Sequence, residues 1–250
     1  MESVKEYRVQ NAPAVAYYLP NFISVEEEQN LQQQIYGAPK PKWKQLAHRR
    51  LQNWGGLPHP KGMVAEAIPE WLQHQMDKIT ALGVFGEKKP NHVLVNEYLP
   101  GQGIMPHEDG PLFYPTITTI SLGGPCQLNL YRPYTSSQNH SEEQAEDREN
   151  AEGNGEQNGN NLEYDLEARY AGSLLLEARS LLVLQEDLYT TFMHGIEETK
   201  EDVVTDRILN LESCAAKIGD TIERSTRISL TIRHVPRVIK AKLLLGNKRR

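Results

Sequence analysis

Between residues 91 and 233 the chain carries many short apolar runs separated by turn signals, and this pattern limits the folds it can adopt. Helical periodicity is mostly confined to the front of the chain. β-Branched residues, which pack well on a pleated sheet, are frequent in the runs. This order predicts a β-sandwich or barrel rather than a parallel α/β sheet. The strands are expected at about 91–99, 116–122, 126–131, 172–176, 180–184, 190–193 and 227–233.

Two helices are predicted before these strands. Ser24 and Glu27 form a capping-box pattern ahead of a helix that ends near Gly37. Apolar residues at three- and four-residue spacing predict a second, amphipathic helix over about 68–82, with Trp71 facing the core.

The net charge of −6 is unevenly distributed along the chain. Residues 142–167 contain ten acidic residues and one arginine, so the rest of the chain carries 26 basic and 23 acidic residues. The segment 135–161 has low complexity and no large apolar residue, so ordering it would bury nothing to offset the lost entropy. We interpret it as a disordered acidic insert in a mildly basic folded body.

Several classes of protein are excluded by composition. The chain has no run of about 18 apolar residues, so no transmembrane helix and no membrane partner are expected. Its first residues, MESVKEYRVQ, lack the apolar core of a secretory signal. Two cysteines, Cys126 and Cys214, are too few for a disulfide framework and favour a reducing compartment. We expect a protein of the cytoplasm and nucleus.

A basic stretch with aromatic residues precedes the second helix. Residues 29–65 contain six basic residues and no acidic one, with Trp43 and Trp54 among them. Basic groups with flat side chains between them suit a phosphate backbone with stackable bases. A solvated strand pair whose tryptophans pack on the core fits the stretch equally well, and both alternatives stay open. The segment 224–250 adds nine Arg or Lys and no acid.

A candidate metal site follows the strand at 91–99. The loop after it presents His107 and Asp109 with one residue between them, and side chains two apart on an extended backbone point the same way. His194, at the end of a short apolar run and before Gly195, is the best placed third ligand. Two histidines and one carboxylate form the facial triad of non-haem Fe(II) oxygenases, although zinc could occupy the same ligands.

The strand expected at 227–233 alternates polar and aliphatic residues, so Arg227, Ser229, Thr231 and Arg233 share one face. Such a face usually meets solvent, but inside a barrel it would line the lumen, where buried arginines need anions. A dicarboxylic ligand would meet that need, which favours an oxygenase over a hydrolytic zinc site. The two arginine Cα atoms lie about 20 Å apart, so one of them could instead pair with a protein carboxylate, for which Asp109 is a candidate.

The strand before the metal loop follows the same logic. Asn96 and Tyr98 share a face next to that loop. An amide and a phenol there could hydrogen-bond the same acid ligand. The alternative is that they are ordinary cross-strand polar residues.

The combined pattern resembles the AlkB-type family of 2-oxoglutarate- and Fe(II)-dependent dioxygenases. The front segment RLQNWG, residues 50–55, resembles the flap that covers nucleotides in that family. The stretch MPHEDGPLFYPTITTISLG is especially similar to one branch of the family, found in animals and plants. The motifs that carry the resemblance span roughly residues 90–235 and are Asn96-x-Tyr98, His107-x-Asp109, His194 and Arg227-x-x-x-Thr231-x-Arg233.

The resemblance implies a mainly β (α+β) fold, a double-stranded β-helix or jelly roll, with N-terminal helices and a nucleotide-recognition-type lid. On this basis residues 1–89 would form the N-terminal extension with its helices and basic aromatic lid. Residues 90–235 would form the dioxygenase core with the acidic insert at 135–161. Residues 236–250 would form a basic C-terminal tail.

The resemblance also implies a set of site residues. Iron would be held by His107, Asp109 and His194. With O2, 2-oxoglutarate would be a cosubstrate, its distal carboxylate paired with Arg227 and its keto-acid end bound near Arg233, Asn96 and Tyr98, with Thr231 in the same motif. The candidate substrate contacts are Arg50, Trp54 and Tyr114. The family pattern commonly has Asn where this chain has Ser229, whose hydroxyl reaches less far.

The activity implied is oxidative demethylation or dealkylation of nucleic acid, DNA or RNA, by a monomer that releases succinate, CO2 and formaldehyde. Two alternatives stay open at this point. One is an oxygenase that acts on protein side chains. The other is a nucleic-acid-binding protein whose metal site is structural or vestigial.

Overall fold

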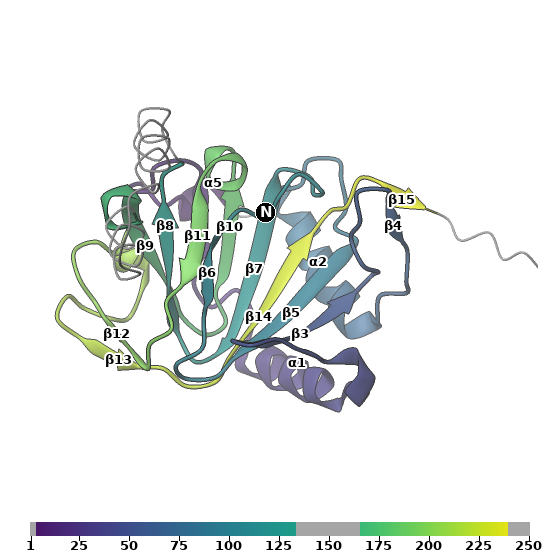
Figure 1. Ribbon diagram of the computed structural model, residues 1–250, viewed down its shortest axis with the longest axis horizontal. Helices are drawn as coiled ribbons and strands as arrows, with labels where there is room; N and C mark the ends of the chain where they lie inside the picture. The colour runs from purple at the N-terminus through teal and green to yellow at the C-terminus, as the bar shows by residue number, and fades with distance from the viewer. Residues whose placement is uncertain (1–3, 134–165, 240–250) are drawn as a thin grey trace, which may run out of the picture.

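Two antiparallel sheets form the body of the protein (Figure 1). The computed structural model describes residues 4–133 and 166–239. The major sheet has seven strands in the order β1 (Ala16–Leu19), β10 (Leu181–Gln185), β7 (Thr116–Gly123), β14 (Arg227–Arg233), β5 (His92–Tyr98), β3 (Arg50–Trp54) and β2 (Lys44–Gln45). The minor sheet has four, in the order β6 (Ile104–His107), β11 (Met193–Ile196), β8 (Cys126–Tyr131) and β9 (Tyr170–Leu176).

Two small pairs of strands lie outside these sheets. β12 (Glu201–Val203) pairs with β13 (Thr221–Glu223), and β15 (Val238–Ile239) runs parallel to β4 (Met63–Val64). The architecture confirms the predicted mainly β jelly roll. Among the described strands the two main sheets pack on each other as a sandwich and do not close into a barrel.

Two helices, α1 (Val25–Gly37) and α2 (Glu70–Ala81), cover the outer face of the major sheet (Figure 1). The predicted capping box begins α1, because the Glu27 N–H donates to Ser24 Oγ at 3.1 Å and the Ser24 N–H donates to Glu27 Oε2 at 2.8 Å. Trp71 is half-buried against this core. The helices and the sheet bury a cluster that includes Leu31, Ile35, Leu72, Met76, Ile79, Val93, Val95, Ile228, Leu230 and Ile232.

A second core lies between the two sheets. It contains Tyr18, Tyr98, Cys126, Leu128, Leu130, Leu174, Leu176, Leu182, Leu184 and Ile196. Because successive strand residues point to opposite faces, the aliphatic positions of β14 pack under the helices and its polar positions face the space between the sheets. Burying both faces of β14 therefore places four polar side chains inside the protein.

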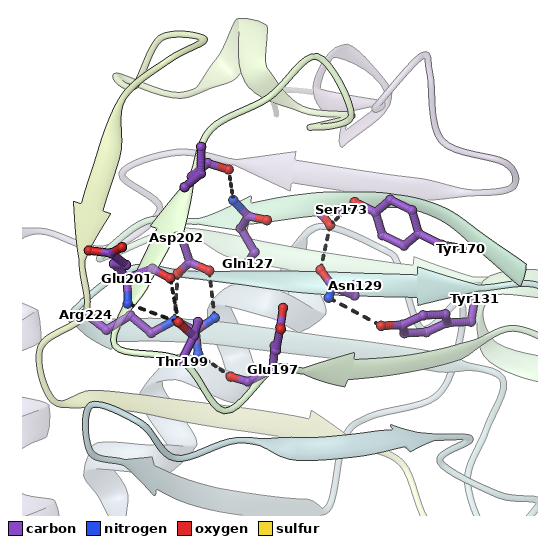
Figure 2. A network of polar contacts seen from close by, with 11 residues as sticks. Gln127, Asn129, Tyr131, Tyr170, Ser173, Glu197, Thr199, Glu201, Asp202 and Arg224 are labelled. Atoms are coloured by element: carbon purple, nitrogen blue, oxygen red, sulfur yellow. Dashed lines mark hydrogen bonds and ion pairs between the residues drawn. The ribbon is translucent and has the colours of Figure 1, made fainter. Parts of the chain in front are cut away.

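The outer face of the minor sheet carries a network of polar contacts (Figure 2) beside a small apolar cluster of Leu175, Val204 and Ile208. Asn129 of β8 donates to the Tyr131 hydroxyl at 3.4 Å and accepts from Ser173 Oγ at 2.6 Å. Nearby, a buried ion pair joins β12 to the residue after β13, because Arg224 donates twice to Asp202 at 2.7 Å (Figure 2). Residues 201–223, for which no strand was predicted, thus contain a short strand pair.

One local prediction needs correction. The strand expected at 190–193 is wrong, because α5 (Asp187–Thr190) occupies its start and β11 begins only at Met193. The backbone amides of residues 189–192 donate to the carbonyls of Glu186 and Asp187, and these hydrogen bonds form a helical turn. The runs at 172–176 and 180–184 are strands, but they belong to different sheets. The turn between them therefore carries the chain from the minor to the major sheet.

The described residues contain no helix that is both long and apolar enough to cross a membrane. Both cysteines are free, as expected; Cys126 is buried and Cys214 is half-buried. The acidic insert predicted at 135–161 and most of the predicted C-terminal tail lie outside the described residues. Of the extension predicted at 1–89, strands β1, β2 and β3 pair within the major sheet.

Candidate active site

A cavity of about 260 Å³ lies between the two sheets. Its apolar walls come from both of them, with Leu128 and Leu176 from the minor sheet and Leu182 and Leu184 from the major sheet. The polar residues that line it are Arg49, Asn96, Tyr98, His107, Glu108, Asp109, Thr119, His194, Arg227, Ser229, Thr231 and Arg233. Eight of these are the residues predicted from sequence to hold a metal or an acid ligand.

The polar face of β14 lines this cavity. Arg227 and Ser229 are each 3% exposed, and Thr231 and Arg233 are each 8% exposed. The strand lies in the middle of the major sheet, paired with β5 on one side and β7 on the other. The alternation therefore marks a buried polar lining and not a solvent-facing surface.

The three metal-ligand candidates meet at one end of the cavity. β11 pairs with β6 so that His194 is opposite His107, and the two imidazole rings have centroids 4.6 Å apart. The Nε2 atom of His194 lies 3.5 Å from Oδ2 of Asp109, on the loop that follows β6. Residues about 85 positions apart in the chain are thus brought into contact by strand pairing.

The protonation of the two histidines suits metal binding. Burial lowers the pKa of His194 to about 4, which the charge of Asp109 opposes and the charges of His107 and Arg233 assist. The ring is therefore neutral near pH 7 and has a free lone pair. The Nδ1 atom of His107 lies 2.9 Å from the Met105 carbonyl, an arrangement that assigns the proton to Nδ1 and leaves the lone pair on Nε2.

The donor set fits an iron ion, although within the described ranges no group of three His, Cys, Asp or Glu side chains already stands in metal-binding geometry. Two imidazoles and one carboxylate are the ligands of non-haem Fe(II) sites. Ligand atoms about 2.1 Å from one ion at right angles lie about 3 Å apart. The 3.5 Å between His194 Nε2 and Asp109 Oδ2 is close to that separation.

The two arginines of β14 have different partners. Nη2 of Arg233 lies 2.6 Å from Oδ1 of Asp109. Arg233 therefore pairs with the protein carboxylate that was predicted as a candidate partner for one of the two arginines. Arg227 donates from Nη2 to Ser121 Oγ at 3.0 Å and lies 5.9 Å from the ring centroid of Tyr98. The Nε atoms of both arginines are buried without a hydrogen-bond partner among the described residues. Unpaired donors of this kind are costly unless a ligand accepts from them.

Asn96 and Tyr98 lie on β5 next to the polar face of β14 and are each 6% exposed. The Oδ1 atom of Asn96 accepts from Nε of Arg49 at 3.3 Å. Burial raises the pKa of the Tyr98 hydroxyl, while the positive charges of Arg227 and Arg49 act in the opposite direction. Arg49 thus contacts Asn96, and Arg227 lies over the Tyr98 ring.

The three candidate substrate contacts do not line the cavity. Arg50 makes a bidentate ion pair with Glu97 at 2.6 and 2.9 Å and stacks over Trp43 at 4.1 Å. Trp54 packs edge-on against Trp71, with ring centroids 5.6 Å apart. Tyr114 packs on the outer core of the major sheet. Their role in substrate binding stays a prediction.

Two features of the site escaped sequence reasoning. Arg49, the residue before β3, lines the cavity, and the available signal was that adjacent residues of an extended segment face opposite ways, which predicts Arg49 and Arg50 on opposite sides. The Tyr189 hydroxyl donates to the carbonyls of Gly110 and Phe113, at 2.7 and 3.1 Å, and so fixes the loop that follows Asp109. No sequence pattern indicated this second contact.

The site geometry agrees with a family match. Residues 42–233, more than half of the chain, match the model of the family described as 2OG-Fe(II) oxygenase superfamily. The chain belongs to this superfamily. It is a 2-oxoglutarate-dependent dioxygenase, and membership of the superfamily implies Fe(II), 2-oxoglutarate and O2.

Relatives within the superfamily place the chain more finely. It is 51% identical to the probable RNA/DNA demethylase ALKBH6 of Danio rerio, over 98% of this chain and 96% of that protein. It is 27% identical to the alkylated DNA repair protein ALKBH8 homolog of Arabidopsis thaliana, over 90% of this chain and 59% of that protein. The resemblance to AlkB-type oxygenases is confirmed, and the similarity to the sixth AlkB homologue extends over nearly the whole chain.

The fold has a solved counterpart. The structure of OsALKBH1 matches with a TM-score of 0.52 over 88% of this chain and 97% of that chain, at 13% identity. At this identity the likeness supports the jelly-roll fold alone.

Proposed function

We propose that this oxygenase oxidatively demethylates or dealkylates nucleic acid. The relative with 51% identity over nearly the whole of both chains is named a probable RNA/DNA demethylase. The observation that carries the proposal is the cavity, in which a His–Asp–His cluster adjoins a buried strand with two arginines. A metal and a small diacid would each find their partners there.

We assign the iron to His107, Asp109 and His194. The neutral His194 ring and the hydrogen bond from the His107 ring to Met105 prepare both imidazoles for a metal, and Arg233 fixes the other oxygen of Asp109. When bound, Fe(II) with 2-oxoglutarate and O2 supplies the oxidant that hydroxylates a C–H bond and leaves succinate and CO2. A methyl group on nitrogen, once hydroxylated, is released as formaldehyde.

We assign 2-oxoglutarate to the polar lining of the cavity. Arg227 suits the distal carboxylate, because its Nε is free and guanidinium–carboxylate pairs are strong in a buried setting. Asn96, Tyr98, Thr231 and Arg233 would orient the remainder of the diacid. Ser229, in place of the family's usual Asn, is 3% exposed and contributes a hydroxyl to the same wall.

The leucines of the two sheets serve a separate purpose. Leu128, Leu176, Leu182 and Leu184 line the cavity beside the polar groups and keep water from them. A dry cavity strengthens each ionic contact within it and protects a reactive site from side reactions.

The segment 29–65 has exposed basic side chains that suit the binding of a polyanion. Lys40, Lys44 and Lys61 are exposed, in a segment that contains no acidic residue. Lys42 and Arg50 of the same segment are engaged with Glu66 and Glu97. We therefore propose that the three exposed lysines contact phosphates, which would make binding salt-dependent.

The direct test measures formaldehyde and succinate together. Purified monomeric protein, Fe(II) and 2-oxoglutarate are incubated with N-methylated DNA or RNA oligonucleotides and, in parallel, with N-methylated peptides. We expect formaldehyde in equal amount to succinate from an oligonucleotide. Release of formaldehyde and succinate in equal amounts from peptides but not from oligonucleotides would identify a protein-directed oxygenase. Binding of oligonucleotides without succinate release under any condition would identify a binding protein with a vestigial metal site.

A further inference from the structure

The turn between β2 and β3 extends to the cavity and carries a third arginine to it. The two strands pair through Lys44 with Leu51 and Gln45 with Arg50, and the Leu46 N–H donates to the Arg49 carbonyl at 2.9 Å. Arg49 lies at the end of this turn and lines the cavity. Its neighbour Arg50 points the other way, into its ion pair with Glu97.

Two contacts hold the turn against the body of the protein. On the inner side, Arg49 Nε donates to Asn96 Oδ1 at 3.3 Å. On the outer side, Nδ1 of His48 lies 3.0 Å from Oε1 of Glu198, two residues beyond the strand that carries His194. The turn is therefore attached both to β5 of the major sheet and to the segment that leaves β11 of the minor sheet.

We propose that Arg49 is a binding residue for the diacid cosubstrate and that the β2–β3 turn closes over that ligand. This inference rests on the proposed assignment of 2-oxoglutarate to the cavity. It adds a guanidinium from the N-terminal segment to the two that β14 supplies.

The direction of the Arg49 side chain favours the cosubstrate over a nucleic-acid phosphate. Asn96 is 6% exposed and lies on the cavity wall, so a guanidinium bonded to it is directed inward. Within the described part of the chain, the Nη atoms of Arg49 have no hydrogen-bond partner. They remain free to donate to a carboxylate beside Asn96 and Tyr98.

The charges in the cavity agree with this role. Arg233 is neutralised by Asp109 at 2.6 Å, whereas no acidic side chain among residues 4–133 and 166–239 is paired with Arg227 or Arg49. The residue between them is Tyr98, which is opposite Arg227 in the β5–β14 register. A dianion would thus meet two uncompensated guanidinium groups on opposite sides of one tyrosine.

The experiment measures ligand binding without turnover. Protein loaded with Mn(II) is titrated calorimetrically with 2-oxoglutarate in the absence of nucleic acid, for wild type, Arg49→Gln and Arg49→Lys. We expect Arg49→Gln to bind about tenfold more weakly or worse, as befits the loss of a charge-assisted hydrogen bond, and Arg49→Lys to be intermediate. Lys88→Gln, which removes the same charge from an exposed position, is the control and should match wild type.

Two further measurements make the outcome decisive. Affinity for a single-stranded oligonucleotide should stay within twofold of wild type in Arg49→Gln, and 2-oxoglutarate should protect the amides of residues 44–50 from hydrogen exchange in wild type only. Normal 2-oxoglutarate binding by a folded Arg49→Gln, or a loss confined to the oligonucleotide, would overturn this inference and leave the proposed function standing. Failure of the wild type to bind 2-oxoglutarate would overturn both.

Discussion

Arg233 and Asp109 form a buried ion pair at the metal end of the cavity, with Nη2 of the arginine 2.6 Å from Oδ1 of the carboxylate. The second oxygen of Asp109 faces His194 at 3.5 Å. One carboxylate thus links the arginine strand to the histidine cluster. The pair ties the position of the candidate metal ligand to the position of β14.

Breaking this pair should destabilise the protein and not only inactivate it. Arg233→Leu leaves Asp109, whose side chain is 6% exposed, as an uncompensated buried charge, which typically costs about 3–5 kcal/mol. Adding Asp109→Asn should restore part of that stability without restoring activity. Urea unfolding of the metal-free proteins, arranged as a double-mutant cycle, measures the coupling. Additive effects of the two substitutions would show that the pair contributes nothing.

Removal of either candidate histidine should abolish the metal-dependent spectrum. We expect His107→Ala and His194→Ala to lose the charge-transfer absorption of Fe(II) with 2-oxoglutarate under anaerobic conditions. Their rates of succinate release should also fall by about a hundredfold or more. His74→Ala is the control, because His74 is exposed on α2 and pairs with Glu27, outside the cavity. Full absorption in His194→Ala would show that the third ligand lies elsewhere.

The stability of the metal-free protein should fall as the solution becomes acidic, in part through His92. Burial, assisted by the charge of Arg233, lowers the pKa of this histidine to about 3 in the folded protein, against about 6.5 unfolded. Between these values the unfolded chain binds a proton that the folded chain does not, so the free energy of unfolding decreases as pH falls. The contribution lost between pH 7.5 and pH 5 is about 2 kcal/mol.

The check is a comparison of urea unfolding at pH 7.5 and pH 5 for wild type and His92→Gln. Other titrating groups are shared by the two proteins, so the difference between their pH responses isolates His92. We expect the variant to lose about 2 kcal/mol less on acidification. An identical pH response would mean that His92 titrates alike in both states.

The exposed lysines should govern the salt dependence of nucleic-acid binding. Replacing Lys40, Lys44 and Lys61 together by Gln removes three candidate phosphate contacts. For a single strand each contact contributes about 0.7 to the slope of log affinity against log salt, so the slope should become shallower by about 2. Lys217→Gln, at an exposed position on the segment between β12 and β13, should leave the slope unchanged. A triple variant with the wild-type slope would place the phosphates on another surface.

Local patterns in the sequence were sufficient for the site strand. β14 begins at Arg227 and ends at Arg233, as the alternation predicts, because a strand buried on both faces must separate its polar and apolar side chains. The capping box of α1 was equally readable, since it depends on residues three apart. The short helix α5 was missed, because four residues are too few for periodicity to tell helix from strand.

The directions of side chains in the N-terminal segment were harder to predict from the sequence. Arg49 and Arg50 are adjacent and chemically identical, and only the register of β3 against β5 decides which one faces the cavity. Sequence reasoning named Arg50 as a substrate contact, which stays a prediction, and did not indicate Arg49, which lines the cavity.

The sequence by itself determined which residue types were available for the chemistry, His107 with Asp109 and the polar face of β14, because their spacing is shorter than one strand. Only the tertiary structure decided that His194 meets that pair, that Arg233 serves Asp109, and that Arg49 reaches the same cavity. The physical reason is that these contacts join strands distant in the chain. Their geometry is fixed by strand pairing and by two sheets packing on each other, which no local pattern encodes.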